Sequence, residues 1–132
     1  MLIFLFLLIG FQPSISDSSV AISVEGQGWT GYGTGTVIAV ENTRSLVITN
    51  AHVVKDDKNP IFISYLYDGE WYKQEATYLS GSKVIDTEKD VVEIDGPDLA
   101  ILELNCKLTP VKFSKQIPKI NSYVKMYGFS GN

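Results

Sequence analysis

The segment Leu46-Val-Ile-Thr-Asn-Ala-His-Val-Val54 carries the only histidine of this 132-residue sequence, at the end of a short apolar run. A second segment, Asp98-Leu-Ala-Ile-Leu-Glu-Leu104, places an aspartate directly before another such run. Short apolar runs bounded by polar residues are typical of buried strands. We therefore expect both segments to contribute strands, with His52 and Asp98 close to strand ends.

Further short runs recur along the chain at intervals of roughly ten residues, separated by Gly, Asn, Asp and Pro. Together with the two segments above, the expected strands are 20–24, 34–40, 46–49, 61–67, 71–79, 91–94, 99–104 and 123–127. Almost no helical periodicity is present, so the pattern predicts an all-β fold, an antiparallel barrel or a sandwich. The break at Asp68-Gly69 predicts a hairpin, and the five glycines between Gly26 and Gly35 predict a second hairpin or a bulge.

Composition excludes several classes of protein. The 45% hydrophobic content can build a core, and eleven basic against fifteen acidic residues give a net charge of −4. This balance argues against a nucleic acid partner, because phosphate neutralisation needs an excess of Lys and Arg. With one cysteine, Cys106, and one histidine, neither an internal disulfide nor a Cys/His zinc site can form. We expect Cys106 to be buried as a small hydrophobic residue.

Five acidic residues lie between Asp86 and Asp95. Their oxygen ligands could in principle hold calcium, but their spacing does not match an EF-hand loop. A solvated loop is the favoured interpretation, and neither a metal nor a cofactor is expected.

The N-terminal residues Met1 to Ile9 are all apolar. This run suits the core of a signal peptide and is shorter than the roughly 20 apolar residues needed to cross a bilayer. We expect residues 1–16 to be a signal peptide cleaved before Asp17, residues 17–132 to form the folded domain, and the mature chain to be exported, periplasmic or extracellular, without stable membrane insertion. Because no Lys or Arg precedes the run, a buried N-terminal strand or a lipid-embedded anchor stays open as an alternative.

His52 and Asp98 together suggest acid–base chemistry. A lone histidine is more often structural, but an imidazole held at one nitrogen by a carboxylate can take a proton from a serine hydroxyl at the other. Asp98 is the favoured partner because Asp86, Asp90 and Asp95 lie in the charged, loop-like stretch, whereas Asp98 adjoins a core strand.

These segments, together with Gly33-Thr-Gly-Thr-Val-Ile-Ala39, resemble the N-terminal half of a trypsin-like serine endopeptidase, closer to the bacterial type of the HtrA/Deg and glutamyl endopeptidase relatives than to the disulfide-rich animal enzymes. The resemblance implies an antiparallel six-stranded barrel, the first of a chymotrypsin-type double barrel, and a polypeptide substrate. It assigns His52 as general base and then acid, and Asp98 as the group that orients it. It also implies that Gly33 and Gly35 bring the main chain close to the bound substrate.

The nucleophile that the resemblance implies is missing from this sequence. In the family it lies in a Gly-x-Ser-Gly-Gly turn of a second barrel, which we expect downstream. Ser130, in Gly128-Phe-Ser-Gly131, lacks the second glycine and is not interpreted as the nucleophile. The resemblance therefore predicts a partial serine endopeptidase that is inactive by itself. The alternative is a complete, secreted, non-catalytic barrel that binds a partner through Tyr65, Tyr67, Trp71 and Tyr72.

Overall fold

The computed structural model describes residues 15–55, 58–86 and 92–130. They form six strands, a single-turn helix and a short 3₁₀ helix. In chain order these are η1 (Ile15–Ser18), β1 (Ser19–Gly26), β2 (Trp29–Glu41), β3 (Arg44–Thr49), α1 (Ala51–Val54), β4 (Ile61–Tyr67), β5 (Glu70–Asp86) and β6 (Val92–Leu104). The predicted all-β class is confirmed.

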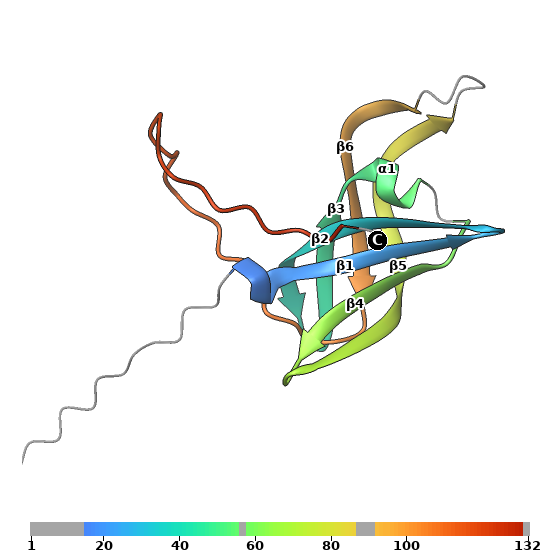
Figure 1. Cartoon of the computed structure of the whole chain (residues 1–132), viewed down its shortest axis with the longest axis horizontal. Coiled ribbons are helices and arrows are strands. Elements are labelled where there is room, and N and C mark those ends of the chain that lie inside the picture. Colours follow the sequence, from blue (N-terminus) through green and yellow to red (C-terminus); the bar gives the residue numbers. More distant parts are fainter. Residues whose placement is uncertain (1–14, 56–57, 87–91, 131–132) are drawn as a thin grey trace, which may run out of the picture.

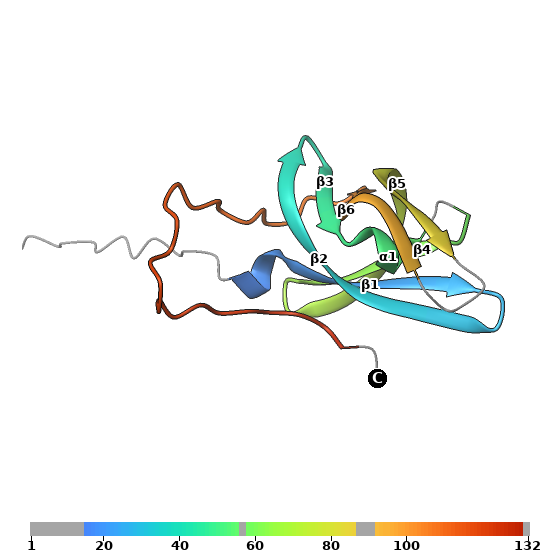
Figure 2. The same cartoon turned by 90° about the horizontal axis from the view of Figure 1, so that it is seen from above.

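The strands form one antiparallel sheet that closes on itself. Their hydrogen-bonded order is β1-β2-β3-β6-β5-β4, and β4 pairs back onto β1 to complete the barrel. Figures 1 and 2 show the strands curving around a common interior, with α1 lying beside β5 and β6 at one end. The six-stranded antiparallel barrel expected from the resemblance is therefore present.

The barrel interior is filled by the inward residues of alternating strands. In β1 every second residue is buried, and the same alternation holds at the start of β4 and at the end of β6. The most deeply buried large side chains are Val20, Ile22, Val24, Val37, Val47, Val54, Ile63, Leu102 and Leu104. Cys106, which was expected to be buried, is only half-buried and packs against this core.

Both predicted hairpins are present. The β4–β5 turn has positive φ at both central residues, 49° at Asp68 and 79° at Gly69, as a two-residue hairpin turn requires. Residues 26–29 close the long β1–β2 hairpin, whose register runs from Ser19↔Thr36 to Gly26↔Trp29.

The acidic stretch is strand rather than loop over most of its described length. β5 extends to Asp86 and β6 begins at Val92, so the separately predicted runs 91–94 and 99–104 join into one strand. Gly96 allows the strand to continue, because it adopts a positive φ of 105° that other residues rarely reach. Pro97 has no N–H to donate, but it lies where the β5–β6 register shifts, so no hydrogen bond of the ladder is lost there. Residues 87–91 lie outside the described part of the chain.

The predicted strand at 123–127 is wrong. After β6 the chain leaves the sheet in an extended excursion over residues 105–130 and returns beside β1 and β2 (Figures 1 and 2). The apolar alternation is present, but a closed barrel offers no free edge for a further strand to pair with.

Most of the expected signal peptide, residues 1–14, lies outside the described residues. Within residues 15–55, 58–86 and 92–130, no helix has the length and apolar character needed to span a membrane.

The excursion is fixed to the barrel at its start by Ser45. This fully buried side chain donates a hydrogen bond to the carbonyl oxygen of Cys106 (2.6 Å) and accepts one from the N–H of Leu108 (2.9 Å). One hydroxyl group thus satisfies two main-chain groups that would otherwise be unpaired.

We expect Ser45→Ala to lower the free energy of unfolding by about 1–3 kcal/mol, because it leaves these two groups without a partner. Urea denaturation measures the change. Ser80→Ala, at an exposed position of β5, is the matched control and should be close to neutral. Equal effects of the two substitutions would contradict the role given to Ser45.

Candidate active site

His52 lies in α1, directly after β3. Asn50 has extended backbone angles (φ −81°, ψ 141°), and the chain then makes one helical turn that ends at Lys55, whose N–H donates to the carbonyl oxygen of Ala51 (2.8 Å). The turn carries the imidazole away from the ladder and leaves 53% of the side chain exposed.

Asp98 reaches His52 because β3 and β6 are neighbours in the barrel. Their register ends with Thr49 opposite Ala100, so the residues after Thr49 run beside those that precede Ala100. Two residues that are 46 positions apart in sequence therefore meet at the same end of the sheet. The expected meeting of His52 and Asp98 is present in the structure.

The Asp98 carboxylate binds His52 through both oxygens. Oδ2 lies 2.5 Å from the imidazole Nδ1, and Oδ1 accepts the His52 main-chain N–H at 3.0 Å. Asn50, at the N-cap position of α1, makes no side-chain capping bond. Asp98 thus accepts a hydrogen bond from an N–H at the start of the helix, a role that the side chain of the N-cap residue usually fills.

Hydrogen bonds from Asn50 and Ser82 hold the main chain around Asp98. The Asn50 amide Nδ2 donates to the Asp98 carbonyl oxygen at 3.0 Å, while Ser82 donates to the carbonyl oxygen of the preceding Pro97. Ser82 lies at an irregularity of β5, where Gly81 passes so close to β6 that an added Cβ would be 2.9 Å from Ala100 Cβ. Side chains therefore hold the main chain on both sides of the Asp98 Cα.

Sequence reasoning had not identified Asn50 or Ser82 as supporting residues. Asn50 adjoins the histidine segment and could have been considered from its position alone. Ser82 carries no sequence signal, because its role depends on where β5 shifts register.

Asp98 is held ionised by these contacts. Desolvation raises the pKa of its carboxyl group, but the main-chain and side-chain hydrogen bonds from His52 and the imidazolium charge together outweigh this, so the net pKa is lowered. At neutral pH the group accepts hydrogen bonds only, which fixes the neutral imidazole with its proton on Nδ1.

The second imidazole nitrogen is open. In the described part of the chain, Asp98 is the only hydrogen-bonding partner of the ring. Nε2 is therefore free to accept a proton from an alcohol placed beside it, which is what a general base requires.

Gly33 and Gly35 are required by packing within the barrel. A Cβ on Gly33 would lie 2.5 Å from Val53 Cγ1, and a Cβ on Gly35 would lie 2.5 Å from Val47 Cγ1. The absence of a side chain at Gly33 lets α1 sit against β2, which is a reason for this glycine that does not involve substrate.

Ser130 belongs to the returning end of the excursion. The N–H of the adjacent Phe129 donates to Thr34 Oγ1 at 2.7 Å, so this segment is held against β2. No hydrogen bond joins Ser130 to His52 within residues 15–55, 58–86 and 92–130. In that same part of the chain, no three His, Cys, Asp or Glu side chains gather where they could hold a metal ion.

Comparison with known families agrees with this geometry. The family model described as a trypsin-like peptidase domain matches residues 33–132, a span that includes His52 and Asp98. The chain therefore belongs to the trypsin-like peptidase domain family. No curated protein and no solved structure matches the sequence.

The lowered pKa of Asp98 predicts an acid-sensitive contribution to stability. Because the folded-state pKa lies below the unfolded one, this contribution is present above about pH 4 and is lost as pH falls through the folded-state value. We expect Asp98→Asn to lose less stability than the native chain between about pH 6 and pH 3, measured by urea denaturation at each pH. Asp95→Asn, an exposed aspartate of the same strand, should keep the native pH dependence.

The His52–Asp98 contact also predicts a tautomer. In the neutral imidazole we expect the proton on Nδ1, and Asp98→Ala should shift it toward Nε2. Long-range ¹H–¹⁵N NMR measures this directly, because the chain has one histidine and the signal needs no assignment. Asp95→Ala is the control, and a native chain with mainly Nε2–H would contradict the contact.

Proposed function

We propose that this chain supplies the general base and its orienting carboxylate in a serine-type endopeptidase. The observation that carries the proposal is the 2.5 Å contact between His52 Nδ1 and Asp98 Oδ2, in a histidine whose side chain is 53% exposed. In a trypsin-like peptidase domain, this pairing is suited to activating a serine hydroxyl.

In the proposed reaction, His52 Nε2 takes the proton of the serine hydroxyl as its oxygen attacks the peptide carbonyl. The resulting imidazolium then donates that proton to the leaving amine, and the acyl-enzyme is hydrolysed by water with His52 again acting as base. Asp98 stays ionised throughout. It stabilises the imidazolium and keeps the neutral ring in the tautomer that leaves Nε2 free.

The serine is proposed to come from a second barrel, because the printed sequence contains no Gly-x-Ser-Gly-Gly turn. The chain without that barrel is inactive. We place the protein with the bacterial HtrA/Deg and glutamyl endopeptidase type, since Val53 stands where animal trypsins have a cysteine. The substrate is a polypeptide, no cofactor is needed, and residues 1–16 direct export to the periplasm or the extracellular space.

Covalent labelling tests this proposal. A chain that includes the second barrel should react with a fluorophosphonate at its serine, and His52→Ala should slow labelling by about 10⁴-fold or more. The 132-residue chain alone should not react. Ser130→Ala is the control and should label at the native rate.

Two results would overturn the assignment. Loss of labelling in Ser130→Ala would make that residue the nucleophile. If the sequence continues for about one domain length without a Gly-x-Ser-Gly-Gly turn, the proposed endopeptidase activity is rejected. The alternative of a non-catalytic binding barrel would then be favoured, supported by the exposed aromatic side chains of Tyr67, Trp71 and Tyr72 on the β4–β5 hairpin. Tyr65, expected in the same exposed set, is instead buried in the core, because its side chain points into the barrel.

A further inference from the structure

Thr34, in β2, holds the returning end of the excursion with its side chain. The hydroxyl oxygen accepts a hydrogen bond from the Phe129 N–H at 2.7 Å, and the hydroxyl group donates one to the Phe129 carbonyl oxygen at 3.4 Å. Gly128 comes so close that an added Cβ would lie 3.2 Å from Thr34 Oγ1. One hydroxyl group therefore bonds both main-chain groups of a residue that is 95 positions away in sequence.

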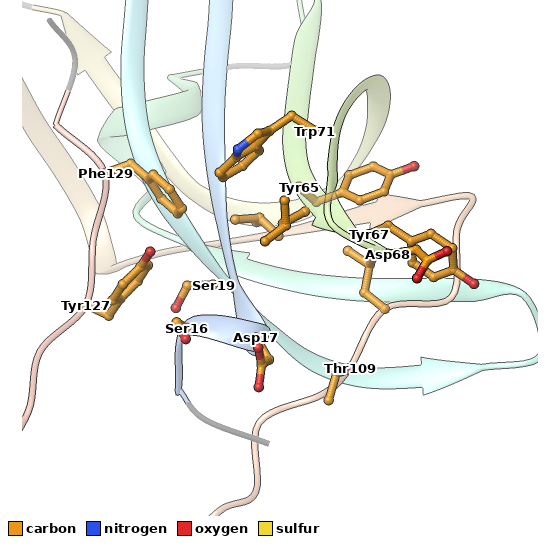
Figure 3. Close-up of a pocket in the computed structure, with 13 residues that line it drawn as sticks. Ser16, Asp17, Ser19, Tyr65, Tyr67, Asp68, Trp71, Thr109, Tyr127 and Phe129 are labelled. Carbon is orange, nitrogen blue, oxygen red and sulfur yellow. The ribbon is translucent and has the colours of Figure 1, made fainter. Parts of the chain in front are cut away.

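The side chain of Phe129 is also held in place. Its ring meets the Trp71 ring edge-on, with centroids 5.9 Å apart, and meets the Tyr127 ring edge-on at 5.5 Å. Figure 3 shows these rings at one side of a cavity of about 390 Å³, which is lined by residues of η1 and of the β4–β5 hairpin. Phe129 is thus fixed to β2 by its main chain and to β5 by its ring.

The main chain of Thr34 is bonded to the strand that leads into the histidine turn. The β2–β3 register ends at Thr36↔Ile48. Beyond this point, the buried hydroxyl group of Thr49 donates a hydrogen bond to the Thr34 carbonyl oxygen at 2.9 Å. Thr49 is the last residue of β3, and the turn that carries His52 follows it. Thr34 therefore joins the end of the excursion to the start of the His52 segment.

We propose that Thr34 is a positioning residue of the proposed endopeptidase, which fixes the segment leading toward the serine in one place relative to His52. The inference rests on the proposed function, in which the serine follows this segment in a second barrel. Proton transfer requires the serine oxygen within hydrogen-bonding distance of Nε2, and a misplacement of about 1 Å lowers such a rate by up to about 10²-fold. Asp98 orients the imidazole, and Thr34 orients the chain that brings the serine to it.

Amide hydrogen exchange at Phe129, measured by NMR on the 132-residue chain, tests the contact itself. Thr34→Val replaces the hydroxyl group with a methyl group, and we expect exchange at Phe129 to become about tenfold faster. Thr34→Ser keeps the hydroxyl group and should restore protection. The His52 tautomer should be native in both variants, because its hydrogen bonds to Asp98 do not involve Thr34.

Thr36→Val is the matched control. Thr36 lies on the same face of β2, and its hydroxyl group makes no hydrogen bond in the part of the chain that the structure describes. Exchange at Phe129 should therefore be unchanged. The proposal is overturned if Thr34→Val leaves exchange at the native rate, or if Thr36→Val accelerates it as much as Thr34→Val does.

Fluorophosphonate labelling of a chain that includes the second barrel tests the consequence for the reaction. Thr34→Val should lower the maximal labelling rate by about tenfold and leave the half-saturating reagent concentration unchanged, because the placement of the serine changes while the imidazole stays oriented. Thr34→Ser and Thr36→Val should label at the native rate.

A native maximal rate in Thr34→Val, or an equally slow rate in Thr34→Ser, would show that the hydroxyl group does not position the serine. Absence of labelling in the native chain would reject the proposed function and the positioning role with it. The exchange experiment separates these failures, because it reports whether Thr34 holds Phe129 whatever the activity of the longer chain.

Discussion

The carboxylate of Asp98 is the group on which the arrangement of the His52 end of this barrel depends. One oxygen holds the imidazole and the other holds the main chain of the same residue, His52. The hydrogen bond from the His52 N–H to Asp98 Oδ1 takes the place of a side-chain cap at the start of α1. Asp98 therefore positions both the imidazole ring and the backbone that carries it. The orientation of the His52 imidazole is thereby coupled to the local fold and does not depend on a rotamer alone.

This coupling requires the closed sheet. β3 and β6 are distant in sequence, and only their pairing with Thr49 opposite Ala100 brings the two segments together. Barrel closure through β1 and β4 leaves neither strand able to slip by one residue without exposing its buried face. The irregularity in β5 at Ser82 then adjusts the approach to Asp98 where a regular ladder would meet Pro97.

Local pattern was sufficient to predict most strands and the His52–Asp98 pair, because apolar alternation and turn residues act over a few positions. The prediction of strands was wrong where pairing depends on segments that are distant in sequence. The residues at 123–127 have the alternation of a strand but find no free edge, and Gly96 lets two predicted runs join into β6. Support from Ser82 depends on a shift of register, a property that no single segment encodes.

The close approach of Gly33 to Val53 links β2 to α1, the helical turn that carries His52. An added Cβ at Gly33 would lie 2.5 Å from one methyl group of Val53 and 2.7 Å from the other. A larger residue at one position has to be matched by a smaller one at the other, so the two sites form a size-complementary pair. In related chains, substitutions at these two positions are therefore expected to be correlated. A larger residue in place of Gly33 requires a residue smaller than valine at position 53.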